Sequence, residues 1–338
     1  MKKILSSLIV FGLSMLVYWL TVPLSDCYIA QWRTFYWDRH YCNEILAQHS
    51  GAWQLIQDFY YQAYATTTGI AAVLAVFTTV LVSVAYALLG KIGALHKVMD
   101  TTVKQSGVYA LLFVLTTVCT MAVRGYFTSS ADKNVRAMMC LAADNKWDTI
   151  IEEYSKVPST TKLENNLKNM AYAERGQLSR RFTANRHPDV NDLFVLEINS
   201  SPYVAALLSD IYWTMGEITM SQMYAFEANE KLGNLSPRLL KRLALTNIVM
   251  GEYRVAEKYI DWLSKTVRHH SWAEYYRTKL SDEAVMADEY LSLKRRCVPE
   301  ENGFPSSRSI PYDLQQIVNR NPGHLPSSEY LKAIGMLR

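Results

Sequence analysis

Two short groups of polar residues could do chemistry, and neither has the spacing that a familiar reaction needs. His269 and His270 are adjacent, and neighbouring residues on a helix point about 100° apart, so the two imidazoles would rarely share a metal ion. The triplet Asp38-Arg39-His40 combines a carboxylate, a guanidinium and an imidazole, but it lies in aromatic sequence typical of a membrane interface. We therefore expect no catalytic residue, no metal and no cofactor.

Familiar motifs of nucleotide and hydrolase chemistry are missing as well. The sequence contains no Gly-rich phosphate loop, no HExxH zinc motif and no GxSxG nucleophile turn. Nucleic-acid binding is not indicated, because residues 126–338 balance 27 Lys and Arg against 26 Asp and Glu. These absences favour a non-enzymatic protein.

The cysteines allow one plausible disulfide bond. None of the five forms a CxxC pair. Cys27 and Cys42 both fall in residues 23–64, which we place outside the cytoplasm, and a bridge between them would close a 16-residue loop in an oxidising compartment. Two buried free thiols are the alternative.

Three long apolar runs must position these residues relative to a membrane. They lie near residues 4–22, 69–89 and 107–123, and each approaches the roughly 20 residues that cross a hydrocarbon core of about 30 Å. We predict three transmembrane helices in a membrane region, 1–125, and a soluble region, 126–338. The first run is expected to be an uncleaved anchor, with a signal peptide as the alternative.

Basic residues set the expected orientation, because they favour the cytoplasmic side. Lys2 and Lys3 precede the first run, and three lysines between residues 91 and 104 separate the second from the third. Residues 23–64 and the C-terminal region then lie outside. In a bacterium with two membranes, this means the cytoplasmic (inner) membrane, a cytoplasmic N-terminus and a periplasmic C-terminal domain.

The segment between the first two runs, residues 23–64, is crowded with aromatic residues. Amphipathic aromatic rings favour the membrane–water interface, so we expect one or two short helices lying on the outer face of the membrane. An aromatic platform for sugar rings or lipid headgroups is the alternative.

A shift of 35 residues aligns two parts of the soluble region. It matches Ser201-Pro202 with Ser236-Pro237, and Met215-Gly216-Glu217 with residues 250–252. Ser followed by Pro is typical of a helix start, and the later Gly permits the positive φ that ends a helix. Each unit is therefore a helical hairpin, and no alternating apolar pattern predicts a sheet.

The second hairpin resembles the tetratricopeptide repeat, in which Gly251, Tyr253 and Ala256 match the turn, the aromatic residue and the small packing residue. Weaker units flank the two clear ones, so we expect four or five stacked hairpins, because one hairpin cannot bury its own apolar face. The predicted fold class is all-α, with three transmembrane helices followed by a tetratricopeptide-like α-α superhelix.

Several short motifs carry a wider resemblance. They are residues 49–52 (HSGA), 59–62 (FYYQ), 234–242 (NLSPRLLKR), 251–253 (GEY) and 256–259 (AEKY). With these motifs the chain resembles an uncharacterised family of bacterial multi-pass membrane proteins with tetratricopeptide-like C-terminal regions. The resemblance implies no activity and no catalytic residues.

In such a stack the first helix of each hairpin lines a concave groove. We expect its exposed side to carry Tyr203, Asp210 and Trp213 in one unit, and Arg238, Lys241, Arg242 and Leu245 in the next. A basic end beside an aromatic end suits an acidic partner segment with an apolar anchor. Ordinary solvated charges are the alternative.

These features favour a membrane-anchored interaction or scaffold protein of the bacterial cell envelope. Its expected partners are the lipid bilayer and an unidentified envelope protein. The alternative is a membrane enzyme or accessory subunit acting on lipid-linked sugars or surface polysaccharide, which would use Asp38, Arg39, His40 and Glu44. An enclosed pocket joining those four residues would favour the enzyme.

Overall fold

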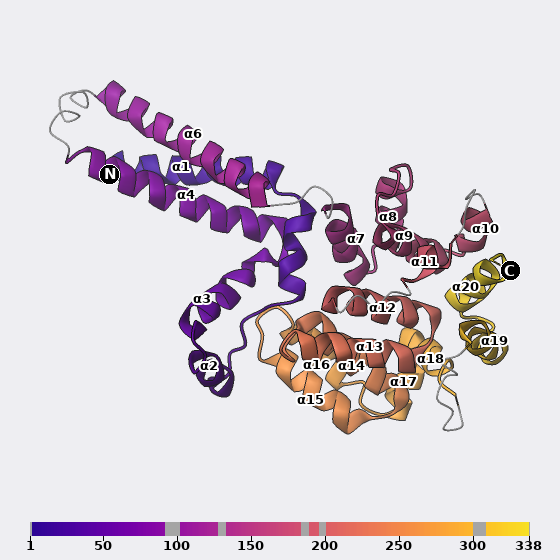
Figure 1. Cartoon of the computed structure of the whole chain (residues 1–338). Coiled ribbons are helices and arrows are strands. Elements are labelled where there is room, and N and C mark those ends of the chain that lie inside the picture. Colours follow the sequence, from indigo (N-terminus) through magenta and orange to yellow (C-terminus); the bar gives the residue numbers. More distant parts are fainter. Residues whose placement is uncertain are drawn as a thin grey trace. The chain divides into compact units, whose positions relative to one another are not determined.

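The chain folds into helices alone throughout the part that the structure describes. The computed structural model describes residues 2–91, 102–127, 133–183, 189–195, 201–299 and 309–337, and every regular element within them is an α-helix or a 3-10 helix (Figure 1). The predicted all-α class is thereby confirmed. Lys97, one of the three lysines between residues 91 and 104, lies outside these residues.

The helices form two compact units. One contains residues 1–28 and 63–137, and the other contains residues 29–62 and 138–338. The division differs from the predicted boundary at residue 125, because the chain enters the second unit early, leaves it, and returns.

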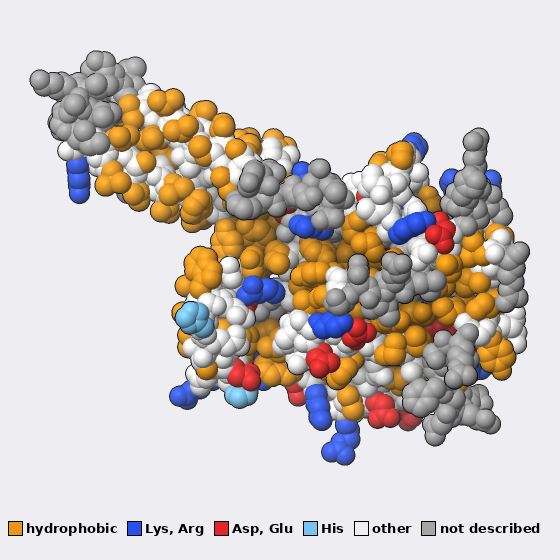
Figure 2. All heavy atoms as spheres, viewed as in Figure 1, with side chains coloured by type: hydrophobic (Ala, Val, Ile, Leu, Met, Phe, Trp, Pro, Cys, Tyr) orange, Lys and Arg blue, Asp and Glu red, His pale blue; other side chains and the backbone are white. Residues whose placement is uncertain are grey.

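The first unit contains the long apolar helices. They are α1 (Lys2–Thr21), α4 (Thr67–Leu89) and α6 (Thr102–Phe127), and α4 packs against both of the others (Figure 1). The short 3-10 helix η2 (Ala63–Ala65) precedes α4, whose first turn is capped by the Thr66 side chain accepting from the Gly69 amide. Hydrophobic side chains dominate the visible surface of these helices (Figure 2).

Two helices among the described residues are long and apolar enough to cross a membrane. They are Thr67–Leu89 and Gln105–Arg124, which correspond to the predicted spans near 69–89 and 107–123. The first predicted span forms a helix, but Leu5–Thr21 qualifies only together with the 3-10 helix η1 (Leu24–Gln31), and the pair is bent by 90°. Two or three helices of this chain could therefore span a membrane.

The second unit is built from short helices that follow one another closely. Its C-terminal part begins within α7 (Lys133–Ala143) and continues through α8 (Trp147–Tyr154), α9 (Lys162–Glu174), α10 (Leu178–Thr183), α11 (Val190–Leu193), α12 (Pro202–Met215), α13 (Ile218–Lys231), α14 (Pro237–Met250), α15 (Tyr253–Ser264), α16 (His270–Arg277), α17 (Asp282–Ala287), α18 (Glu289–Arg295), α19 (Ile310–Arg320) and α20 (Leu325–Gly335). From α12 to α16 each helix packs against the next.

The 35-residue repeat forms two hairpins, α12–α13 and α14–α15. Pro202 and Pro237 occupy the first turns of α12 and α14, and Gly216 and Gly251 end these helices with φ of 85° and 86°. Any residue with a Cβ is strained at such a φ, so glycine is required at both turns. The preceding serines stand at the N-cap positions, but their side chains make no capping hydrogen bond.

Residues 29–62 belong to the core of the second unit. This segment contains α2 (Arg39–Leu46) and α3 (Gly51–Tyr61). Tyr36 is buried and donates from its hydroxyl to the Leu235 carbonyl at 2.8 Å, and the Trp37 amide donates to the Lys265 carbonyl at 2.7 Å. The segment forms the two short helices that the sequence predicted, but several of its aromatic rings pack against α14 and α15. Whether these helices also lie on a membrane stays a prediction.

Candidate functional site

The predicted groove residues lie on α12 and α14, and most of them meet in one buried charge cluster. Asp210 is its centre: Arg238 Nη2 donates to Asp210 Oδ2, and Arg242 Nη2 donates to Asp210 Oδ1 at 2.8 Å. Only 11% of the Asp210 side chain and 8% of the Arg238 side chain are exposed. The expectation that these charges face solvent is wrong, because the three side chains are largely buried and pair with one another.

The electrostatics of Asp210 are those of a buried, fully compensated carboxylate. Burial alone would raise its pKa, but the adjacent guanidinium groups of Arg238 and Arg242 outweigh burial and hold the pKa below its ordinary value of 3.8. The carboxylate therefore stays charged at neutral pH and holds α14 against α12.

Arg238 also connects the cluster to the early segment of the chain. Its Nη1 donates to Gln31 Oε1 and to the Met139 carbonyl, the latter at 3.2 Å. The guanidinium lies over the Trp32 ring, 5.4 Å from its centroid, and Trp32 meets Tyr203 edge-on at 5.1 Å. One end of the predicted groove is thus closed by residues 31 and 32.

The other end of the cluster is aromatic. Arg242 lies over Trp213, 4.5 Å from the ring centroid, and the Trp213 indole Nε1 donates to the Tyr290 hydroxyl at 2.6 Å. Trp213 is buried, so it is an internal packing residue and not the exposed anchor that the sequence suggested.

Lys241 and Leu245 are the members of the predicted groove that stand apart from the Asp210 cluster. Both are half-buried. The Lys241 ammonium lies 5.3 Å from the Trp272 ring centroid, and within the described residues it makes no ion pair. Burial, with a smaller contribution from Arg268, lowers the Lys241 pKa to about 8. Among the described residues Lys241 is thus a cation without an ion pair, although the carboxylate of Asp144 lies close enough to oppose part of this shift.

A second polar group lies at the end of α12 and has the composition of catalytic machinery. Lys294 Nζ donates to the Trp213 carbonyl at 2.7 Å and lies 2.9 Å from His324 Nε2. His324 Nδ1 contacts Ser327 Oγ, which donates to the Met215 carbonyl at 2.6 Å.

The hydrogen-bond directions in this group point to structure, not to catalysis. With Lys294 as the donor to Nε2, the neutral imidazole carries its proton on Nδ1, directed at Ser327, and in this tautomer it does not accept the serine proton. All three side chains are buried, and burial next to Lys294 lowers the His324 pKa to about 2. The group donates to two carbonyls in the last turn of α12, those of Trp213 and Met215.

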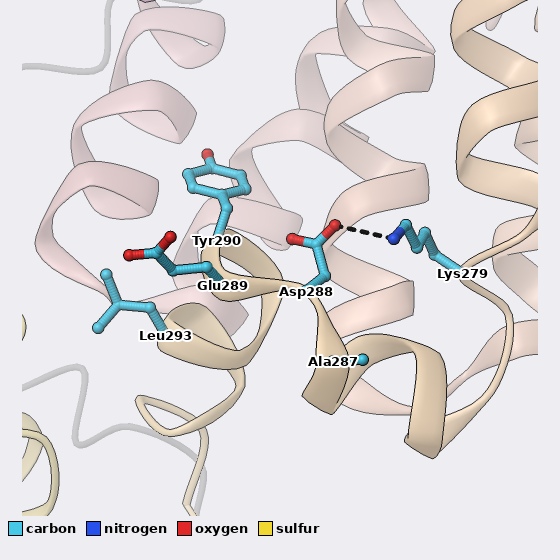
Figure 3. Close-up of a pocket in the computed structure, with 6 residues that line it drawn as sticks. All are labelled: Lys279, Ala287, Asp288, Glu289, Tyr290 and Leu293. Atoms are coloured by element: carbon cyan, nitrogen blue, oxygen red, sulfur yellow. Dashed lines mark ion pairs between the residues drawn. The ribbon is translucent and has the colours of Figure 1, made fainter.

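One open pocket, with a volume of about 540 Å³, lies on α17 and α18 (Figure 3). Its lining residues are Lys279, Ala287, Asp288, Glu289, Tyr290 and Leu293. Asp288 forms an ion pair with Lys279 at 3.1 Å and accepts a hydrogen bond from the Tyr275 hydroxyl at 3.0 Å. The charges of Lys279 and Asp288 therefore compensate each other.

The four residues that the enzyme alternative needs do not converge. Asp38 caps α2 by accepting from the Tyr41 amide at 3.0 Å and pairs with Lys265 at 2.9 Å. These two contacts lower its pKa. Arg39, His40 and Glu44 are exposed on α2.

The other sequence-based candidates are placed as follows. His269 is buried and His270 Nδ1 contacts the Ser264 carbonyl, and no group of three His, Cys, Asp or Glu residues in the described chain could hold a metal. Cys27 is buried in the first unit and Cys42 half-buried in the second. The bridge between them stays a prediction.

The chain was also compared with known proteins. No curated protein and no solved structure matches it. A family model described as a family of unknown function (DUF6057) matches residues 104–338, more than half of the chain, and the chain therefore belongs to that family.

Proposed function

We propose that the chain is a membrane-anchored, non-enzymatic interaction protein of the bacterial cell envelope. The observation that carries the proposal is that two separate segments of the chain, residues 29–62 and 138–338, pack together in the second unit. Between them the chain runs through α4 and α6, the two helices that could each cross a membrane. Two crossings return the chain to the side from which it started, so the two parts can fold together.

The proposed orientation follows from the basic residues. Lys2 and Lys3 favour a cytoplasmic N-terminus. If α1 crosses the membrane once, residues 29–62 emerge outside, and the even number of later crossings puts residues 138–338 on the same side. The second unit is then periplasmic in a bacterium with two membranes.

The interaction role is supported by the hairpins. The succession of α12 to α16 fits a tetratricopeptide-like stack, in which first helices share a concave face. Since Arg238 and Arg242 both pair with the buried Asp210, the cation of the predicted groove that forms no ion pair is Lys241, with Leu245 and Tyr203 on the same two helices as apolar contacts. The enzyme alternative loses support, because Asp38 is engaged in capping α2 and in pairing with Lys265.

The orientation is tested by cysteine accessibility in intact cells with a permeabilised outer membrane. His49→Cys and Lys258→Cys lie at exposed positions in the two separate parts of the second unit, and Lys91→Cys lies just after α4. A membrane-impermeant thiol reagent should label positions 49 and 258 but not 91. Unequal labelling of 49 and 258 would contradict a common side for the two parts. The protein with only its native cysteines gives the blank.

The partner surface is tested by charge reversal in the full chain. Lys241→Glu should abolish chemical cross-linking to an envelope protein, because an acidic partner would be repelled. Lys231→Glu, on the exposed end of α13, is the matched control and should leave the cross-link intact. An identical cross-linking pattern in both variants would refute the role of Lys241.

A further inference from the structure

The helix α3 has one face packed inward and one apolar face left open. Leu55 and Asp58 face the rest of the second unit, to which α3 belongs. Leu55 packs against the core of this unit, and Asp58 is buried. On the opposite side Trp53, Ile56 and Phe59 are 62%, 60% and 55% exposed. Positions three apart share one side of a helix, so these side chains form a continuous surface.

The inward face holds α3 firmly in place. The buried carboxylate of Asp58 accepts from Arg33 Nε at 2.7 Å and from the Tyr41 hydroxyl at 2.8 Å. Leu55 adds apolar packing against the core of the same unit. The outward side chains are therefore presented by a fixed helix.

The open surface extends beyond α3 and carries no charge of the helix itself. Trp37 meets Phe59 edge-on at 6.2 Å, and Trp37, Leu46 and Tyr60 are also exposed. Asp58, the single charged residue of α3, is turned inward. We define the membrane-facing patch as Trp37, Leu46, Trp53, Ile56, Phe59 and Tyr60.

We propose that the membrane-facing patch binds the interfacial layer of the lipid bilayer. Trp, Tyr and Phe on an amphipathic helix are the side chains that this layer favours, because it offers both hydrocarbon and water. Sequence adjacency argues for lipid over a protein partner, since five residues, 62–66, separate α3 from the apolar helix α4. The inference rests on the proposed anchoring of α4 in the membrane.

The patch gives the segment 29–62 two simultaneous roles. Tyr36 and Tyr41 fill the core of the second unit, while the membrane-facing patch contacts lipid. An interfacial helix of this kind buries its apolar side to a depth of about 5–10 Å at the boundary of headgroups and acyl chains. Because α3 is fixed to the second unit, binding of the patch would keep that unit at the membrane surface.

The test uses the full chain reconstituted in lipid vesicles, with one fluorescent non-natural amino acid at a chosen position. Ile56 is the test position, and Phe226 on α13, 56% exposed, is the matched control from the same unit. Brominated lipids should quench the probe at 56 and not at 226, whereas aqueous iodide should quench the probe at 226 and not at 56. Both positions tolerate a probe because both are exposed.

A third position separates this inference from the proposed membrane anchoring. Phe77 is exposed in the middle of α4 and should be quenched by brominated lipids if α4 crosses the bilayer. Lipid quenching at 77 with iodide quenching at 56 would overturn the inference and leave the anchoring intact. Protection of 56 from both quenchers would also overturn it, because the patch would then be covered by protein, including a second copy of the chain. No lipid quenching at 77 would refute the anchoring itself.

Discussion

The Asp210 cluster permits a quantitative prediction about stability. Asp210→Asn keeps the size and shape of the side chain but removes the charge that compensates Arg238 and Arg242. Removing one partner from a buried ion pair costs about 3–5 kcal/mol, because the remaining charge stays buried without compensation. For a unit of this size each kcal/mol corresponds to about 2–4 °C of melting temperature, so we expect a loss of roughly 6–20 °C.

The measurement is thermal unfolding of the purified full chain in detergent, followed by tryptophan fluorescence. Glu227→Gln is the control, because its pair with Lys231 is exposed and such pairs contribute only about 0.3–0.5 kcal/mol. A loss of less than 2 °C in the melting temperature of Asp210→Asn would refute the reasoning. It would indicate that these charges are solvated, as the sequence analysis expected.

The pH dependence of the same variant provides an independent check. The folded-state pKa of Asp210 is lowered, so its contribution to stability is present above its ordinary value of 3.8 and is lost as the pH falls through the folded value. The difference between wild type and Asp210→Asn should therefore persist from neutral pH down to about 4 and shrink below it. A difference that vanished at pH 5 would contradict the assignment.

Three further outcomes are expected from thermal unfolding of single variants. Burial, with a smaller effect of Asp313, raises the pKa of Glu217 to about 7, so the stability of the wild-type protein should fall as the pH rises from 4.5 to 7. The variant Glu217→Gln should therefore be more stable than wild type at pH 8, by up to about 3 kcal/mol, and equally stable at pH 4. Gly216→Ala should lower the melting temperature more than Gly251→Ala. A Cβ at position 216 would lie 3.0 Å from the Cys297 sulfur, whereas a Cβ at position 251 would lie 3.6 Å from its nearest neighbour, a guanidinium nitrogen. Equal losses of melting temperature in the two variants would contradict this reasoning. Tyr41→Phe should cost about 2 kcal/mol, because a buried carboxylate loses a donor, and an unchanged melting temperature would show that water replaces the hydroxyl.

The sequence predicted the parts of the fold that depend on local signals. Pro202, Pro237, Gly216 and Gly251 mark the ends of two helices because proline and glycine act on the backbone at their own positions. The apolar runs likewise identified α4 and α6, because the length of an uncharged helix is a local property.

The candidate site was misjudged because its contacts are not local. The exposure of Arg238 depends on Asp210, 28 residues away, and on Gln31, 207 residues away. Helical periodicity reports which face of α14 is apolar, but it carries no information about a polar partner supplied by a distant segment. The sequence contained one indication that residues 29–62 are partly buried, namely the many aromatic residues before α4. The same aromatic residues are also typical of a membrane interface, so they did not distinguish a protein core from a membrane surface.

The return of the chain to its second unit has a consequence for the order of events during synthesis. Tyr36 meets the Leu235 carbonyl 199 residues later in the chain, which at about 5–20 residues per second is a delay of roughly 10–40 s. Throughout this interval the early aromatic segment has been made but its binding surface has not. The unit therefore cannot fold from its N-terminus onward, and residues 29–62 wait without their packing partners until α4, α6 and the hairpin helices α14 and α15 have been synthesised.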